Sequence, residues 1–229
     1  LGTSMKSTGE VMAIGRCFEE AFLKAWASLE QGAPHPRPLT RADESEGEGM
    51  ADRALEQLPD NVLIDWLRIA TDRRMGAVIE AFRRGWAIER VHEITRITRW
   101  FLYGFQRIAN IENEIVARGC SPNDVTASEF RKWKSHGFSD GHIADALSGF
   151  PATGLKEISA SRNEQAVMSA RHSHVVHPIF RMVDSCAAEF AAVTPYYYAT
   201  YEGGCAPAGV DHVPSEKKPD RRRLVVIGS

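Results

Sequence analysis

Apolar residues at three- and four-residue steps fill the middle of this chain, from about residue 60 to residue 170. This spacing places the apolar side chains on one face of an α-helix, which must be buried against a neighbour. The longest pattern begins after Thr98, a residue suited to cap a helix N-terminus, and ends at Gly119. Its apolar residues are Leu102, Phe105, Ile108, Ile111 and Ile115. The pattern predicts a mainly α-helical domain that contains one long helix.

Shorter patterns of the same kind predict further helices. They cover residues 18–29, 65–84, 88–94, 128–136, 141–147 and 156–170. In the first of them, Glu19 and Glu20 fall in the opening turn, where negative charge favours the helix N-terminus. Strand patterns return only late, at residues 179–183, 196–201 and 224–227. The expected fold class is therefore mainly α, with a helical middle flanked by the ends of α/β domains.

Two stretches interrupt the regular patterns. Residues 32–59 combine an acidic run at 43–48 with the prolines Pro34, Pro36, Pro38 and Pro59. Residues 203–219 are rich in glycine, proline and charged residues. Such compositions favour exposed connectors over packed elements, because proline and clustered charge disrupt both helices and strands.

Composition excludes several classes of protein. A formal charge of −2 argues against a strongly basic nucleic-acid binder. No apolar run approaches the roughly 20 residues of a membrane span, and the N-terminus lacks the pattern of a signal peptide. The cysteines Cys17, Cys120, Cys186 and Cys205 are scattered, which is typical of reduced thiols. We therefore expect a cytoplasmic protein that contacts neither membrane nor nucleic acid.

Two groups of side chains could carry chemistry but have simpler interpretations. His172, His174 and His177 suggest a metal site, and in a strand the first two would share one face. No acidic or cysteine partner completes the set nearby, so a polar loop is the preferred interpretation and no metal is expected. The tyrosines at 196–198 could stack on nucleic-acid bases, but without a basic groove we expect a packed strand.

A third feature leads to a rival function. The predicted helices at 128–136 and 140–147, joined across residues 137–139, have the spacing of a helix-turn-helix. The second helix offers Asp140, His142 and Asp145, which are poorly suited to contact phosphates. DNA binding is therefore the weaker alternative.

Two blocks resemble the carbamoyl-phosphate synthase large-chain family. Residues 5–16 read Met-Lys-Ser-Thr-Gly-Glu-Val-Met-Ala-Ile-Gly-Arg, similar to a segment near the end of that family's first ATP-grasp half. Residues 183–190, Val-Asp-Ser-Cys-Ala-Ala-Glu-Phe, and 194–202, Thr-Pro-Tyr-Tyr-Tyr-Ala-Thr-Tyr-Glu, are similar to its junction between the helical domain and the second half. Weaker matches lie between them in family order, at residues 72–75, 80–85, 92–95, 100–102 and 137–140.

The resemblance implies an internal piece of a much larger ligase, a reading that fits a chain without an initial Met. The implied divisions are the end of the first half at 1–32, a linker at 33–59, a helical oligomerisation domain at 60–176, and the start of the second half at 177–229. The family uses ATP and Mg²⁺ in sites that would lie outside this chain, so we expect this piece alone to be inactive and to bind neither. The implied partners are the remainder of the large chain, a glutaminase small chain and further copies of the helical domain.

The resemblance also singles out individual residues, none of them catalytic. Glu10 would lie near the interior passage for carbamate, with Lys6 and Arg16 flanking it; ion pairing with a neighbour or exposure to solvent is the simpler role for each. Asp184 and Glu189 would act as structural partners of Arg181 at the junction with the second half. The non-enzymatic alternative is a free-standing helical interaction module.

Overall fold

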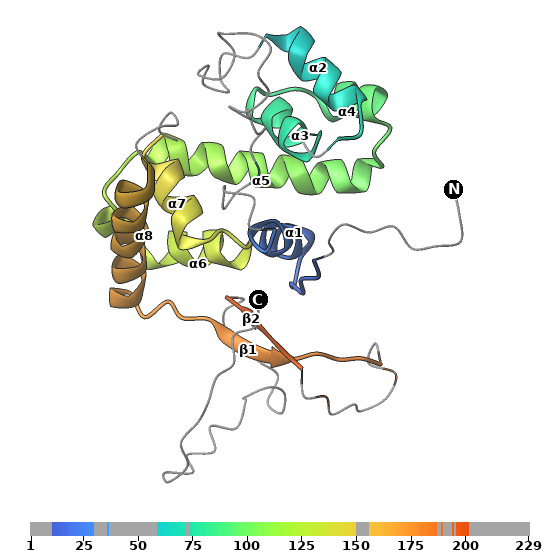
Figure 1. Ribbon diagram of the computed structural model, residues 1–229. Coiled ribbons are helices and arrows are strands. Elements are labelled where there is room, and N and C mark those ends of the chain that lie inside the picture. Colours follow the sequence, from blue (N-terminus) through green and yellow to red (C-terminus); the bar gives the residue numbers. More distant parts are fainter. Residues whose placement is uncertain are drawn as a thin grey trace.

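A computed structural model of the chain is mainly helical, as predicted (Figure 1). It describes residues 11–29, 36, 59–71, 74–149, 156–186, 189, 194 and 196–201, with the backbone alone for 156–162. The elements are α1 (Phe18–Ala27), α2 (Asp60–Arg68), α3 (Arg74–Arg83), α4 (Ile88–Thr95), α5 (Arg99–Arg118), the 3₁₀ turn η2 (Pro122–Asp124), α6 (Ala127–Ser135), α7 (Asp140–Leu147), α8 (Lys156–Ser173), β1 (Ile179–Met182) and β2 (Tyr197–Thr200).

The long helix α5 is the centre of the fold (Figure 1). Helices α3 and α4 pack on one side of it, α1 on the other, and α7 near its C-terminal end, where α8 covers α7. The predicted stripe of α5 is buried, with Leu102, Ile108 and Ile115 fully covered. One continuous apolar core includes these residues together with Leu23 of α1 and Trp133 of α6. The periodicity of the long helix therefore predicted its core face correctly.

The predicted helix at 65–84 is wrong, because the structure divides this region into α2 and α3. Helix α2 buries Leu63 and Leu67, and its stripe would continue through residues 70–74. An unbroken helix would place Thr71 and Arg74 on this stripe, so it would carry the charge of Arg74 into the core. The backbone instead turns extended at Ile69, and a new helix begins at Arg74 with its own buried face.

Several predicted helix ends are confirmed. Gly119 follows α5 with a left-handed φ of 45°, a conformation that glycine adopts without strain. Ser139 caps α7, since its hydroxyl accepts the backbone N–H of His142 at 3.0 Å. Thr98 occupies the N-cap position of α5 as predicted, but its side chain makes no capping hydrogen bond. Helix α6 begins at Ala127, one residue before the predicted start, with a capping box of Thr126 and Glu129 that was not predicted. The described helices include none with the length and hydropathy of a membrane span.

The predicted strands at 179–183 and 196–201 form an antiparallel pair, β1 with β2, in which Ile179 faces Thr200 and Met182 faces Tyr197. The pair lies apart from the helices, except where the end of β2 approaches α1 and α6 (Figure 1). The tyrosine strand is only partly packed, because Tyr196 and Tyr197 are exposed whereas Tyr198 is half-buried. The predicted strand at 224–227 and most of the two connectors lie outside the described residues.

Candidate functional site

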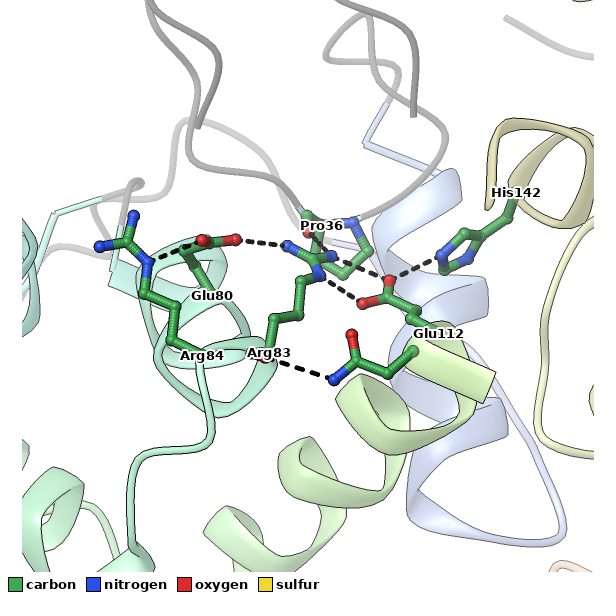
Figure 2. A network of polar contacts seen from close by, with 7 residues as sticks. Pro36, Glu80, Arg83, Arg84, Glu112 and His142 are labelled. Carbon is green, nitrogen blue, oxygen red and sulfur yellow. Dashed lines mark hydrogen bonds and ion pairs between the residues drawn. The ribbon is translucent and has the colours of Figure 1, made fainter. Parts of the chain in front are cut away.

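Three helices meet at a buried ionic contact centred on Glu112 of α5 (Figure 2). Arg83 of α3 donates to both carboxylate oxygens of Glu112, from Nε at 2.5 Å and from Nη2 at 2.9 Å. The Nε2 atom of His142 in α7 lies 2.7 Å from Oε1 of the same carboxylate. The Glu112 side chain is 0% exposed and that of His142 is 1% exposed. A two-pronged arginine contact fixes orientation as well as distance, so it sets how α3 and α7 sit on α5.

The charges of this contact are stabilised by one another. Burial alone would raise the pKa of Glu112, but the charge of Arg83 and the hydrogen bond with His142 lower this pKa from 4.5 to about 2. Burial would lower the pKa of Arg83, and Glu112 outweighs that effect and raises it. The carboxylate therefore stays ionised at neutral pH with both oxygens occupied. This arrangement suits a structural ion pair rather than proton transfer.

The contact continues through Glu80 of α3, which lies between Arg83 and Arg84 (Figure 2). Its carboxylate accepts from Arg83 Nη1 at 3.3 Å and from Arg84 Nε at 2.9 Å. Arg84 Nη1 in turn donates to Asp60 of α2 at 3.1 Å. Arg83 Nη2 also donates to the backbone carbonyl of Pro36, at 3.1 Å, in the predicted linker. A chain of ionic contacts thus runs from α2 to α7.

A second ionic cluster joins α6, α7 and α8 around Asp140. Lys134 Nζ lies 3.0 Å from Asp140 Oδ1, and Arg171 Nη2 lies 2.9 Å from Oδ2. Burial opposes ionisation, yet Arg171 and Lys134 lower the pKa of Asp140. Arg171 also donates to the carbonyl of Val176 at 2.7 Å. The ring of Tyr201, just after β2, lies 4.9 Å from Lys134 Nζ, within range of a cation–π contact.

Only one of the three residues predicted for the carbamate passage is described. The backbone N–H of Arg16 donates to Oε2 of Glu20 at 2.6 Å, so it is held against the first turn of α1. Lys6 and Glu10 lie outside the described residues. Their assignment to a passage stays a prediction.

The two predicted junction residues flank one turn after β1. Asp184 Oδ1 accepts the backbone N–H of Cys186 at 3.0 Å, and the N–H of Glu189 donates to the Cys186 carbonyl at 2.9 Å. Both acidic residues are exposed. The structure brings them to the same turn, and their predicted pairing with Arg181 stays a prediction.

Sequence reasoning missed the role of the two glutamates that open α1. Glu19 and Glu20 lie in the first turn of α1 as predicted, but the sequence did not indicate that both are buried. Glu19 pairs with Arg107 of α5, and Glu20 pairs with Lys24 at 2.9 Å. The four-residue step between Glu20 and Lys24 is a signal that could have revealed the second pair.

The histidine group differs from the expected polar loop. Helix α8 continues to Ser173, so His172 lies in its last turn and only His174 and His177 follow it. The His172 and His177 rings lie 5.0 Å apart, and the His174 ring is 6.0 Å from that of Phe130. Among the described residues, no group of three or more His, Cys, Asp or Glu side chains is placed to hold a metal ion.

The structure argues against the helix-turn-helix alternative, because its second helix is not exposed. Helices α6 and α7 form as predicted, but residues 140–147, all of them described, are each buried or half-buried. His142 and Asp140 are engaged in the two ionic clusters. A recognition helix must present side chains to a DNA groove, so α7 is placed as a core helix instead.

Comparison with known proteins agrees with these features. A family model described as "Carbamoyl-phosphate synthetase large chain, oligomerisation domain" matches residues 10–173. The carbamoyl phosphate synthase arginine-specific large chain of Halalkalibacterium halodurans is 37% identical over 229 residues, which are 100% of this chain and 18% of the relative. The chain thus spans less than a fifth of the length of that relative. The chain belongs to the carbamoyl-phosphate synthetase large-chain family and contains the oligomerisation domain of that family.

Proposed function

We propose that the chain is the interdomain and oligomerisation region of a carbamoyl-phosphate synthase large chain. The whole enzyme would make carbamoyl phosphate from bicarbonate, ATP and glutamine-derived ammonia. This region would hold the two synthetase halves in register, so that labile carbamate passes between them rather than into water. The observation that supports this most is the 37% identity, along the full 229 residues, to an arginine-specific large chain.

The packing of α1 supports the scaffold role. This helix lies in the stretch predicted to end the first half, yet Leu23 belongs to the same core as the helical domain. Phe18 meets Phe105 of α5 edge-to-face, with ring centroids 5.1 Å apart. At Gly104 of α5, an added Cβ would overlap the Phe18 ring, so the two helices touch with nothing between them. Such packing favours one rigid unit over two units joined by a hinge.

The surface at the start of α5 supports contacts with other protein surfaces. Trp100, Phe101 and Tyr103 are 61%, 44% and 48% exposed. The rings of Trp100 and Phe101 pack against each other and against Phe18, which fixes them in place. Clustered exposed aromatic side chains are typical of binding surfaces. This observation also suits the alternative, a free-standing interaction module without enzymatic activity.

The remaining parts of the proposal follow from the family. Partners would be the rest of the large chain, a glutaminase small chain and further copies of this domain, in the cytoplasm. ATP and Mg²⁺ would bind in the flanking halves, because this sequence contains no phosphate-binding motif. The name of the relative supports the arginine pathway. Two further parts of the proposal rest on the family resemblance. They are a role in pyrimidine synthesis and a passage wall formed by Lys6, Glu10 and Arg16.

A chimeric enzyme tests the proposal. This chain would replace the matching segment of the Halalkalibacterium halodurans large chain, assembled with a glutaminase small chain. We expect carbamoyl phosphate synthesis with the parent's ratio of product to ATP hydrolysed and the parent's oligomeric state, and we expect no synthesis by this chain alone. A chimera that assembles like the parent but makes no carbamoyl phosphate would contradict the scaffold role and favour the interaction module. Synthesis by the isolated chain would contradict the proposal outright.

A further inference from the structure

Lys24 of α1 contacts two backbone segments that lie far apart in the sequence. Its Nζ atom donates to the carbonyl of Ile14 at 3.0 Å, in residues 11–16, which we call the entry segment. The same atom donates to the carbonyl of Ala199 in β2. One ammonium group therefore joins the segment that leads into the helices to the strand that follows them.

Glu20 holds both Lys24 and the entry segment. Its Oε1 atom lies 2.9 Å from Lys24 Nζ, and its Oε2 atom accepts the N–H of Arg16 at 2.6 Å. The carboxylate is buried, so its charge is poorly compensated by water and its attraction to Lys24 is strengthened. The entry segment is thus fixed at two backbone groups, the carbonyl of Ile14 and the N–H of Arg16.

Close packing around Glu20 leaves the pair little freedom. At Gly15, an added Cβ would lie 2.6 Å from the backbone nitrogen of Ala21, so the entry segment runs directly against α1. At Gly137, between α6 and α7, it would lie 2.7 Å from Cα of Glu20, and the φ of Gly137 is +91°. Both sites need glycine because a side chain would push backbone segments apart. The α6–α7 turn therefore also packs directly against the backbone of Glu20.

At the end of β2, Thr200 is buried and the following Tyr201 packs against the apolar core. Within the described part of the chain, β2 has few close neighbours among the helices. An open pocket of about 190 Å³ lies beside this contact, lined by Ala199 and Tyr201 and by Leu23, Lys24 and Phe138. The ring of Tyr198 lies 5.8 Å from Lys24 Nζ. The hydrogen bond from Lys24 to the Ala199 carbonyl is a direct polar contact between α1 and β2.

We propose that Lys24 is a positioning residue that holds the entry segment and β2 together at one side of α1. Removing its ammonium group takes the donor from the carbonyls of Ile14 and Ala199 and the counter-charge from Glu20. Both segments then loosen together. The positioning role itself does not depend on the proposed function. Its consequence in the enzyme does, because there these segments would connect the helical domain to the two synthetase halves.

Amide hydrogen exchange of this chain tests the inference. Lys24→Met keeps the aliphatic stem and removes the charge, and Lys24→Arg keeps the charge. Lys132→Met is the matched control, because Lys132 is 49% exposed and pairs with Glu114 of α5, away from the two segments. We expect Lys24→Met to speed exchange about tenfold in both 11–16 and 197–201 while α5 stays protected. Lys24→Arg should restore much of the protection, and Lys132→Met should change neither segment.

Several results would overturn the inference. These are faster exchange in only one segment, in neither, or equally in the Lys132→Met control. If Lys24→Met does not fold, Lys24→Gln replaces it, since its amide keeps N–H donors but carries no charge. Spin labels at Met12→Cys and Tyr197→Cys, two exposed positions, supply a second measurement, the spread of distances between the segments. That spread should widen on loss of the ammonium group, and an unchanged spread would overturn the inference.

The chimeric enzyme separates this inference from the proposed function. There, Lys24→Met should lower the carbamoyl phosphate formed per ATP hydrolysed, and Lys132→Met should not. If exchange shows both segments loosened but this ratio is unchanged, the positioning role of Lys24 stands and its link to the scaffold function is wrong. If exchange is unchanged, the positioning role is wrong whatever the ratio.

Discussion

Replacing Glu112 with glutamine should show how much the buried ionic contact contributes to stability. Glutamine keeps the size of the side chain but removes the charge that faces Arg83 and His142. The pKa of Glu112 falls from its ordinary value of 4.5 to about 2, which corresponds to roughly 3 kcal/mol in favour of the ionised folded state. Breaking a buried pair by removing one partner costs about 3–5 kcal/mol in other proteins. We therefore expect Glu112→Gln to lower the free energy of unfolding by about 3 kcal/mol at neutral pH.

The pH dependence gives this prediction its sharpest form. Because the folded pKa of Glu112 lies below the unfolded one, its stabilisation is complete above pH 4.5. It declines as the pH falls below that value and is lost near pH 2. The glutamine variant has no such carboxylate. The difference in stability between the two proteins should therefore shrink from about 3 kcal/mol toward zero across this window.

Urea unfolding followed by far-UV circular dichroism, repeated at several pH values, measures this difference. Glu114→Gln is the matched control, because Glu114 is 43% exposed and pairs at the surface with Lys132. An exposed pair contributes about 0–1 kcal/mol, so this control should change little. A Glu112→Gln effect no larger than the control's, or one that stays constant down to acid pH, would refute the reasoning.

Two further substitutions probe the packing and the second ionic cluster. Gly104→Ala should lower the free energy of unfolding by about 1–3 kcal/mol, because the new methyl overlaps the Phe18 ring. Thermal unfolding measures this, and an equal loss in a Phe18→Ala background would show that the clash is not the cause. Asp140→Asn should cost roughly 3 kcal/mol in urea at neutral pH, because Lys134 and Arg171 lose their common partner. The lowered pKa of Asp140 means that this loss should fade as the pH drops below 3.8; a loss that persists there contradicts the assignment.

The helices could be predicted because their signal is local. A stripe such as Leu102, Ile108 and Ile115 lies within one helix, and a packed core needs little more than a correct apolar face. The break between α2 and α3 was also visible in principle, since a continued α2 would place Thr71 and Arg74 on its buried face. It was missed because the apolar pattern resumed at once on a new face.

The ionic contacts could only be partly predicted. Glu112 lies four residues after Ile108 and three before Ile115, so its phase alone places it on the buried face of α5. Its partners could not be predicted in this way, because Arg83 and His142 lie 29 and 30 residues away in the sequence. Nothing local connects them, and only the packing of α3 and α7 on α5 brings them together. The link from Lys24 to Ala199 spans 175 residues and is hidden for the same reason.

Apolar packing combined with buried ionic contacts suits a region that must hold a fixed geometry better than it suits maximal stability. An apolar core tolerates small rotations of one helix on another, because its attraction is not directional. A bidentate pair such as Arg83 with Glu112 does not, since both hydrogen bonds weaken when the helices turn. Apolar residues in its place would often be as stable. The buried charges therefore favour a chain that must hold a fixed geometry, as a region between two synthetase halves would. Lys24 would extend this fixed geometry to the entry segment before α1 and to β2 after the helices.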